Sequence, residues 1–260
     1  MLSSKIIDVR SLISSRYEFL EATKAYDELS SDPSLLGILL DYKSDVSERI
    51  KSSINLKQHY KISSGVPSLG VIGAGNYSSR ILIPALKRTG ANLHTLVTAN
   101  GISSKLQGEK SGFINSSTEV ESILGNEEID TVVIATRHDT HAELVISSLN
   151  AGKNVWVEKP LAIDLDSLSL IEEAYSNAHN KATGSNPGPQ LMVGFNRRFD
   201  NSHAKVKQAR ENQEIGQLEM LVITSRDPEP PGLEYLNAAG GFFRDTTIHD
   251  FDLSRFILGN

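Results

Sequence analysis

From residue 68 onward, short apolar runs alternate with helical segments, and this alternation constrains the fold more than any other feature of the sequence. Four runs rich in Val, Ile and Leu are expected to be buried strands: 68–72, 93–98, 131–135 and 154–157. The segments between or after them are expected to be helices: 79–88, 117–124, 141–151 and 167–177. Strands that alternate with helices predict an α/β fold, in which helices cover both faces of a doubly wound parallel sheet.

Length and composition exclude several classes of protein. With 260 residues, the chain is long enough for one large domain or two smaller ones. The formal net charge is −6, so there is no basic surplus for a nucleic-acid backbone, and we expect no nucleic-acid partner. The absence of cysteine excludes disulfides, thiolate metal sites and a cysteine nucleophile, and it fits a reducing compartment. No spacing of His and carboxylates stands out as a set of metal ligands.

The sequence also carries no sign of a membrane or a secretory route. No apolar run approaches the roughly 18 residues that a spanning helix requires. The N-terminus lacks a basic region followed by an apolar stretch and a small-residue cleavage site, so we expect no secretory signal. We therefore predict a cytoplasmic protein with no membrane partner.

Residues 1–64 form a leading section without a catalytic motif. Pro33 is expected to stop a helix there. The expected elements are strand, helix, strand, helix and a polar linker, in that order: 6–9, 18–29, 35–40, 46–56 and 61–64. The letters DVRSLISSRYEFLEATKAYDELS and LLGILLDY resemble the closing segment of zinc-type, medium-chain alcohol dehydrogenases. The zinc ligands and the nucleotide fold of that family are not in this section, so none of its chemistry is carried over.

A glycine turn, GAGNYS (73–78), directly follows the first strand of the alternating pattern and opens its first helix. Gly73 permits the tight turn, and Gly75 lets the backbone approach a pyrophosphate, for which the helix N-terminus supplies N–H donors. Ser78 stands where the motif usually has a third Gly or Ala. A lone Gly-x-Gly is often a plain turn, but the order of strand, turn and helix predicts a dinucleotide site that includes Asn76, Tyr77 and Ser78.

The strand after the glycine turn ends without the acidic residue that usually binds the adenosine ribose of NAD. The letters TANG (98–101) stand at that point, and Ser103, Ser104 and Lys105 follow. This hydroxyl-rich turn, with Thr98 as a candidate cofactor-binding residue, suits a 2′-phosphate, but its residues are equally typical of an ordinary loop. We therefore expect NAD or NADP as cofactor, and the sequence leaves the choice open.

Polar residues follow two later strands of the predicted sheet, where doubly wound folds bind their ligands. The letters TRHDTH (136–141) follow one strand, and Glu158-Lys159-Pro160 follows the next. Pro160 biases Lys159 towards an extended backbone, which would hold the ammonium in the crevice. Each residue also has a simpler interpretation: Thr140 as a helix cap, the histidines as loop or cap residues, and Lys159 as a solvated lysine.

A resemblance to the Gfo/Idh/MocA family of nicotinamide-dependent sugar and cyclitol oxidoreductases is carried by LGVIGAGNYSSRILIPAL, DTVVIATRHDTHAELVISSLNAGKNVWVEKPL and LMVGFNRRFD. It covers about residues 66–260, and the Glu-Lys-Pro segment is its most specific part. The resemblance implies a Rossmann domain followed by an open mixed α/β sheet that holds the substrate. It implies that Lys159 orients the substrate and relays a proton, and that Thr136 and His138 lie beside the nicotinamide ribose. We count Glu158 among the cofactor-binding residues.

This chain departs from the family at Arg137, where many relatives have Pro. The departure lies in the turn between Thr136 and His138, which are both expected to adjoin the cofactor. The detail of that turn is therefore not carried over from the family.

The segment GGFFRDTTIHDFD (240–252) holds a further candidate pair. If it is helical from about Thr246, Asp245 and His249 are four residues apart, so the carboxylate can contact the imidazole. Such a pair suits oxidation of a secondary alcohol, because His249 can take the hydroxyl proton while Asp245 fixes the ring tautomer. Taken alone, the pair is equally typical of a cap or a surface. With SRDPEPP before it, the segment is similar to inositol 2-dehydrogenases, which implies the catalytic set Lys159, Asp245 and His249.

Asn196 and Arg197 follow a strand and are candidate substrate-binding residues, because they can donate hydrogen bonds to sugar hydroxyls or an anionic group. Arg198 is instead expected to pair with a surface carboxylate. Two acids are expected to be charges on a helix face: Asp250 and Asp252. Four aromatic residues are expected in the core and not against the substrate: Phe242, Phe243, Phe251 and Phe256.

We place the Rossmann domain at 66–187 and a truncated substrate domain at 188–260. Members of the family continue beyond the point where this chain stops, so we expect a piece of a longer reading frame. A sheet that lacks strands leaves apolar surface and edge groups uncovered, which favours self-association. We expect the full-length form to be a homo-oligomer.

The leading hypothesis is an NAD(P)-dependent oxidoreductase that acts on a secondary alcohol of a cyclitol, sugar or polyol. The alternative is a non-catalytic dinucleotide-binding module or an inactive truncated fragment. The presence of Lys159, Asp245 and His249 together favours the enzyme.

Overall fold

The computed structural model describes residues 8–42, 51–180, 187–226, 229, 232 and 240–259. The chain divides into two compact units, Met1–Lys51 and Ser52–Asn260. Among the described residues, no helix is long and apolar enough to cross a membrane.

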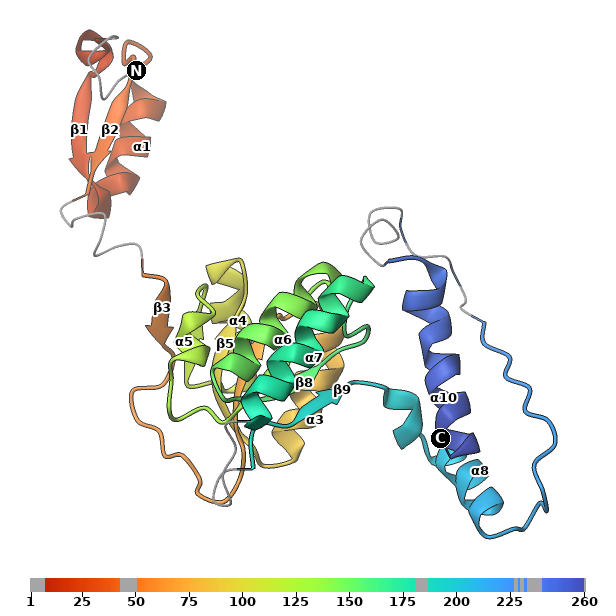
Figure 1. Cartoon of the computed structure of the whole chain (residues 1–260). Helices are drawn as coiled ribbons and strands as arrows, with labels where there is room; N and C mark the ends of the chain where they lie inside the picture. Colours follow the sequence, from red (N-terminus) through yellow and green to blue (C-terminus); the bar gives the residue numbers. More distant parts are fainter. Residues whose placement is uncertain are drawn as a thin grey trace. The chain divides into compact units, whose positions relative to one another are not determined.

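The first unit is a small βαβ arrangement, in which α1 connects two parallel strands (Figure 1). Its elements are η1 (Arg10–Leu12), β1 (Ser15–Glu18), η2 (Phe19–Glu21), α1 (Ala22–Ser31) and β2 (Ile38–Asp41). The predicted helix and second strand are present with shifted bounds. The predicted strand at 6–9 is not found at Asp8 and Val9, and its first half lies outside the described residues.

The second unit is built on a seven-stranded sheet with the order β3-β6-β5-β4-β7-β8-β9. Its strands are β3 (Ser53–Asn55), β4 (Ser68–Ile72), β5 (Asn92–Val97), β6 (Asn115–Ser117), β7 (Thr131–Ile134), β8 (Asn154–Val157) and β9 (Leu191–Val193). Strands β4 to β9 are parallel, and β3 pairs antiparallel with β6 at the edge. Numbered along the chain, the six parallel strands lie in the order 3-2-1-4-5-6, which is the Rossmann order and confirms the predicted fold class.

Helices connect these strands and pack on the sheet. They are η3 (Ser78–Leu82), α3 (Ile83–Arg88), α4 (Gly101–Ser111), α5 (Glu121–Leu124), η4 (His138–Thr140), α6 (His141–Asn150) and α7 (Leu165–Asn180). Figure 1 shows α6 and α7 side by side, and α6 contacts both β7 and β8.

Two apolar cores lie on the two faces of the sheet. On β7, Val132 and Ile134 join the core that contains residues of α6 and α7, whereas Val133 joins the core that contains Ile83 of α3. Successive side chains of a strand point to opposite faces, so a strand covered on both sides buries every residue. This explains why the central strands appear in the sequence as continuous apolar runs.

Helix α4 and strand β6 were not expected from the sequence. Residues 101–111 contain two glycines and three serines, a composition typical of a loop. They are helical because Asn100 caps the N-terminus and Gly112, with φ of +90°, ends the helix. A Cβ on Gly108 would lie 2.6 Å from Leu56, so this glycine lets α4 approach the segment after β3. Tertiary packing therefore outweighs the local composition.

Two predicted boundaries also differ from the structure. A helix is predicted at 46–56, but residues 53–55 form β3 beside β6, and residues 46–50 lie outside the described residues. The part of the leading section from residue 52 onward thus belongs to the second unit. We place the substrate domain from residue 188, but β9 pairs with β8 and extends the Rossmann sheet. In both cases a strand joins a sheet edge that no local pattern reveals.

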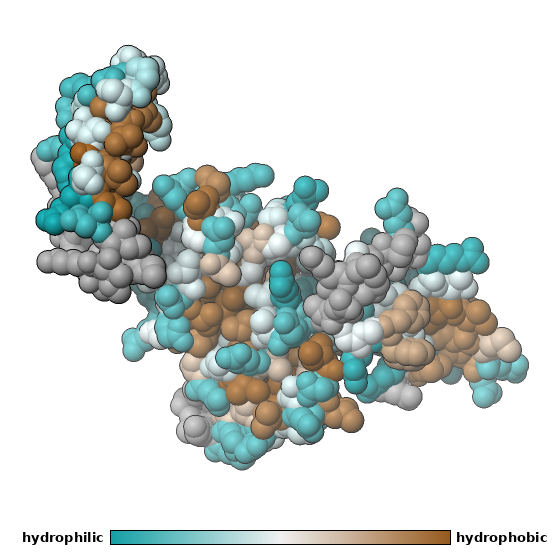
Figure 2. Space-filling model, turned by 90° about the horizontal axis from the view of Figure 1, so that it is seen from above, coloured by the Kyte–Doolittle hydropathy of each residue, from teal (hydrophilic) through white to brown (hydrophobic). Residues whose placement is uncertain are grey.

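Beyond β9, the described residues form helices and no strand. These helices are η5 (Asn196–Phe199), α8 (Asn201–Glu211), η6 (Phe243–Thr247) and α10 (Ile248–Leu258). Helices α8 and α10 pack against each other (Figure 1). Apolar surface is visible over these C-terminal helices in Figure 2. The open sheet of the substrate domain therefore stays a prediction.

Candidate active site

The candidate site lies where three neighbouring strands end at the same edge of the sheet. The glycine turn follows β4, the segment 136–141 follows β7, and Glu158-Lys159-Pro160 follows β8. Strand β7 pairs in parallel with both β4 and β8, so these three carboxyl ends are adjacent. The order of strands reverses between β4 and β7, which is where doubly wound sheets bind their ligands.

The glycine turn fits the pyrophosphate of a dinucleotide. Gly73 has φ of +100°, and a Cβ there would lie 2.4 Å from the Ala135 carbonyl oxygen, so only glycine fits between β4 and β7. A Cβ on Gly75 would meet nothing within 4 Å, which leaves open space beside the turn. The buried Ser78 hydroxyl donates to the Gly73 carbonyl at 2.8 Å and closes the turn. The helix begins at Asn76, and its first N–H groups have no partner within the helix.

The turn after β5 is neutral and partly occupied by its own hydrogen bonds. The Thr98 hydroxyl donates to the Asn100 carbonyl at 2.7 Å, and Oδ1 of Asn100 accepts the Ile102 N–H at 3.0 Å. Ser104 is buried and donates to a main-chain carbonyl, so it is not available to a ligand. Ser103 and Lys105 remain exposed.

His141 connects two of the strand ends, a role that the sequence did not reveal. Its ring is fully buried, with Nδ1 2.7 Å from the Pro160 carbonyl and Nε2 3.3 Å from the Thr136 carbonyl. Burial lowers the pKa of His141, so the ring is neutral and carries a single N–H. The shorter distance assigns that proton to Nδ1, which donates to Pro160. The signal in the sequence was a histidine at the first position of a helix, directly after a polar turn.

Thr136 and His138 lie in the turn after β7, as predicted. The Thr136 hydroxyl lies 2.7 Å from the Thr140 hydroxyl, which itself donates to the Arg137 carbonyl at 2.8 Å. Thr136 is therefore the donor of the pair. His138 begins η4, and its ring centroid lies 5.7 Å from that of His141. These contacts close the turn on itself despite the arginine at position 137.

Lys159 and Asp245 form the central ion pair of the site. Nζ of Lys159 donates to Oδ1 of Asp245 at 2.8 Å and to the Asp245 main-chain carbonyl at 2.8 Å. The two side chains are only 16% and 12% exposed. An ammonium has three N–H groups, so one remains for a ligand. The Lys159–Pro160 peptide bond is cis.

His249 lies close to this ion pair. Its Nδ1 is buried without a hydrogen-bond partner, and its ring meets Phe195 edge to face at 6.5 Å between centroids. Burial lowers the pKa of His249, and the positive charges of Lys159 and Arg197 lower it further. The negative charges of Asp245 and Asp250 raise it, but their effect is smaller. The ring is therefore neutral at pH 7 and can accept a proton.

The predicted contact between the Asp245 carboxylate and the His249 ring is not formed at Nδ1. The Asp245 carboxylate accepts from Lys159, and Nδ1 of His249 has no partner. The segment η6, which contains Asp245, is π-helical, so its wider turn removes the stacking that residues four apart have on an α-helix. Asp245 still acts on the ring through its charge.

Arg197 and Arg198 each pair with an acid of α10. Arg197 pairs with Asp250, and the Ser225 hydroxyl also donates to that carboxylate at 2.6 Å. Nε of Arg198 donates to Asp252 at 2.7 Å. The Asp252 side chain is only 8% exposed. Arg198 therefore pairs with a buried acid and not with the predicted surface carboxylate, and Asp252 is not an exposed charge on a helix face. Burial of α10 against η5 brings these residues together.

Tyr77, Glu158 and Asn196 lie near one another between the glycine turn and β9. Burial and the charge of the Glu158 carboxylate raise the pKa of the Tyr77 phenol, and the Asn196 amide lowers it. Burial raises the pKa of Glu158, and its Oε1 is buried without a hydrogen-bond partner. A Cβ on Gly194 would lie 3.2 Å from this oxygen, so a glycine leaves room for the carboxyl group. An unpartnered buried oxygen beside the glycine turn suits a cofactor-binding residue.

The predicted core position is wrong for three of the four phenylalanines. Phe242, Phe243 and Phe251 are 68%, 69% and 55% exposed. The described residues provide no layer against this side of η6 and α10. Phe256 is partly buried beneath two cations, with Nζ of Lys207 4.4 Å from its ring centroid.

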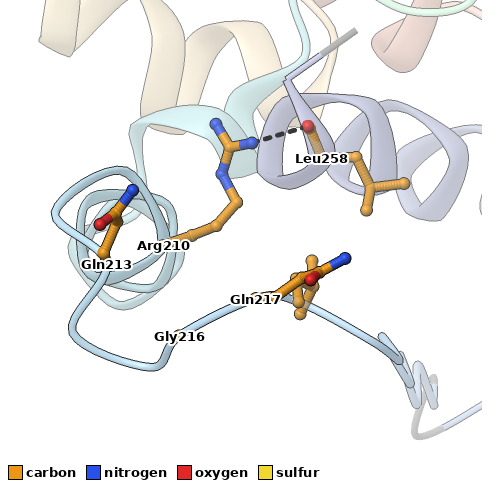
Figure 3. Close-up of a pocket in the computed structure, with 6 residues that line it drawn as sticks. Arg210, Gln213, Gly216, Gln217 and Leu258 are labelled. Atoms are coloured by element: carbon orange, nitrogen blue, oxygen red, sulfur yellow. Dashed lines mark hydrogen bonds between the residues drawn. The ribbon is translucent and has the colours of Figure 1, made fainter.

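A cavity of about 620 Å³ at the ends of α8 and α10 shares no residue with this site (Figure 3). Arg210 crosses it and donates to the Leu258 carbonyl at 2.8 Å. The other lining residues carry amides or apolar groups: Gln213, Gly216, Gln217 and Leu218. This cavity offers no acid or base for the predicted chemistry.

Comparisons with known proteins agree with this geometry. A model of an oxidoreductase family with an NAD-binding Rossmann fold matches residues 68–183, and a model of the GFO/IDH/MocA C-terminal domain matches residues 203–260. The chain is 43% identical over 140 residues to inositol 2-dehydrogenase of Rhizobium meliloti (strain 1021), a match that covers 54% of this chain and 40% of that protein.

Solved structures show the same similarity. A myo-inositol dehydrogenase from Corynebacterium glutamicum is 30% identical with a TM-score of 0.65, and the match covers 75% of this chain and 56% of that one. The scyllo-inositol dehydrogenase from Lactobacillus casei, solved with NAD(H) and scyllo-inositol, is 25% identical with a TM-score of 0.61, over 75% of this chain and 56% of that one. The chain spans about half the length of the relatives it matches.

Proposed function

Because the chain belongs to the Gfo/Idh/MocA family of oxidoreductases, related to the inositol dehydrogenases, we propose that it transfers a hydride between a nicotinamide cofactor and a secondary alcohol of a cyclitol, sugar or polyol. The observation that carries the proposal is the pair of Lys159 and Asp245 beside a neutral His249. Relatives named as inositol dehydrogenases support the class of substrate.

His249 is the general base in this proposal. A neutral imidazole has one nitrogen that accepts a proton. Because Nδ1 is buried, Nε2 is the nitrogen that takes the proton of a substrate hydroxyl. The lowered pKa of His249 keeps this nitrogen unprotonated across neutral pH.

Lys159 orients the substrate in this proposal. Two of its N–H groups are held by Asp245, which leaves the third for the substrate hydroxyl oxygen. The ammonium also stabilises the negative charge that develops on that oxygen as the proton leaves. Asp245 prevents the ammonium from swinging out to solvent, so it positions the charge.

The cofactor is expected to lie along the edge formed by β4, β5 and β7. The glycine turn would hold the pyrophosphate, Thr98 would adjoin the adenosine ribose, and Thr136, His138 and Glu158 would surround the nicotinamide ribose. When bound, the nicotinamide supplies the acceptor for the hydride of the carbinol carbon. Asn196 and Arg197 are proposed to contact the substrate. We further propose that the full-length form is a homo-oligomer, which the exposed aromatic residues of α10 and η6 support.

Turnover assays with a panel of cyclitols, sugars and acyclic polyols, each with NAD⁺ and NADP⁺, test the proposal. We expect cofactor reduction with at least one polyol, and loss of that reduction in both Lys159→Ala and His249→Ala. Full turnover in both variants would show that the assigned roles are wrong. Binding of NADH or NADPH by calorimetry, with no turnover on any substrate of the panel, would favour a non-catalytic dinucleotide-binding module instead.

A further inference from the structure

The turn after β5 carries an uncharged residue at the position where dinucleotide folds usually place an acid. Strand β5 ends at Val97, and Thr98 is the next residue. In NAD-binding folds, a carboxylate near this point accepts hydrogen bonds from the 2′-hydroxyl of the adenosine ribose. The stretch from Thr98 to Ser104 contains no acid, and the first charged residue is Lys105.

Thr98 offers one neutral oxygen in place of that carboxylate, because a hydroxyl that donates its proton keeps its lone pairs but carries no charge. Its hydroxyl proton is directed to the Asn100 carbonyl, and the Asn100 side-chain oxygen is used as the cap of α4. The exposed groups that remain around the turn are the hydroxyl of Ser103 and the ammonium of Lys105. Among the described residues, Lys105 forms no ion pair. The serine hydroxyl can donate a hydrogen bond and the lysine ammonium carries a positive charge, so both suit an anion.

We propose, on the basis of the function proposed above, that the adenosine end of this site accepts a 2′-phosphate and that the chain binds NADP(H) at least as tightly as NAD(H). A carboxylate has two effects at this position: it binds the free 2′-hydroxyl, and it repels a 2′-phosphate. Thr98 leaves only an uncharged acceptor for the 2′-hydroxyl, and it removes the repulsion of a 2′-phosphate. Affinity for NAD(H) is therefore reduced, and the barrier to NADP(H) is absent.

One acid that follows the neighbouring strand could supply the missing carboxylate. Glu119 follows β6, which is the parallel neighbour of β5, and its side chain is exposed. Its carboxylate accepts no hydrogen bond from the described residues, whereas its main-chain groups bond to Ser117 and Ser122. The experiment must therefore separate Glu119 from Thr98.

Calorimetric titration of the full chain with NADPH and with NADH tests the proposal without an activity assay. We expect a Kd for NADPH equal to or lower than that for NADH. Thr98→Asp should raise the Kd for NADPH by about tenfold or more, because the new carboxylate repels the 2′-phosphate. Thr98→Asn, which has the same size without the charge, should leave the ratio of the two Kd values close to that of the parent chain.

Other outcomes overturn the proposal. Binding of NADH tenfold or more tightly than NADPH in the parent chain would overturn it while leaving the oxidoreductase function intact. Loss of NADH affinity in Glu119→Gln would also overturn it, because β6 would then supply the ribose acid. Failure of both nucleotides to bind a chain with a native circular dichroism spectrum would overturn the proposed function itself, and the specificity with it.

Discussion

The ammonium of Lys159 lies 2.8 Å from both the carboxylate and the main-chain carbonyl of Asp245, 86 residues further along the chain. The contact connects the end of β8 to η6, so the C-terminal helices are held against the carboxyl edge of the Rossmann sheet. Because His249 follows Asp245 within the same helical stretch, the contact also determines which groups surround its ring. Lys159 lies in the segment that matches the NAD-binding domain, and Asp245 lies in the segment that matches the C-terminal domain. The position of the lysine therefore depends on an acid from the other domain.

Replacement of Asp245 by Asn is expected to lower both stability and turnover. The lysine would lose a charged partner in a site where both side chains are mostly buried, at a cost of about 1 to 3 kcal/mol in the free energy of unfolding. Urea denaturation measures the change. Glu172→Gln, an exposed acid on α7, is the matched control and should alter stability by less than about 0.5 kcal/mol. Equal stability of the two variants would show that the ion pair does not hold the C-terminal helices.

Activity is expected to fall as the pH is lowered, because His249 becomes protonated. The apparent pKa of this fall should lie below the ordinary histidine value of 6.5. His249 accepts a proton only when neutral, and its lowered pKa means that protonation occurs at a lower pH than for a free imidazole. Arg197→Gln removes one of the positive charges that lower this pKa, so the acid limb of kcat/KM should move to higher pH. A pH profile of kcat/KM measures the apparent pKa in the parent chain and its shift in the variant. An acid limb above pH 6.5 in the parent chain would contradict the assignment of His249 as base.

His141→Ala is expected to destabilise the protein by about 1 to 3 kcal/mol, because two buried carbonyl oxygens lose their contacts to the ring. His59→Ala, at an exposed histidine, is the control. Burial lowers the pKa of His141 in the folded state, so below pH 6.5 the unfolded chain binds more protons than the folded one. Stability should therefore decrease as pH falls below 6.5, and part of this decrease should disappear in the variant. Denaturation at several pH values provides the measurement.

Substitutions in the glycine turn should separate folding from cofactor binding. Gly73→Ala places a Cβ 2.4 Å from the Ala135 carbonyl in a left-handed conformation, so we expect a loss of at least about 1 to 2 kcal/mol in stability. Gly75→Ala meets no protein atom within 4 Å and should leave the melting temperature unchanged. The added methyl group would occupy the space beside the turn, so the Kd for dinucleotide should rise. Unchanged affinity in Gly75→Ala would place the pyrophosphate elsewhere.

The alternation of apolar runs was sufficient to predict the central strands and the doubly wound fold. Strands β4, β5, β7 and β8 were predicted because side-chain periodicity is a local property that a few residues reveal. Strand β6 and helix α4 were not, because their residues are polar or small and are held by neighbours. Gly108 of α4 packs on Leu56, and Ser116 of β6 lies between β3 and β5.

The candidate site divides in the same way. By itself, the sequence determined which chemical groups are present: the glycine turn after a strand, the Glu-Lys-Pro segment, and an acid and a histidine four residues apart. Only the tertiary structure decided how these groups meet. The Asp245 carboxylate, which was expected to contact His249, accepts a hydrogen bond from Lys159, and the buried His141 connects two strand ends. The physical reason is range, because propensity and periodicity act over one or two turns of chain, whereas contacts across 86 residues depend on how a whole sheet and its helices pack.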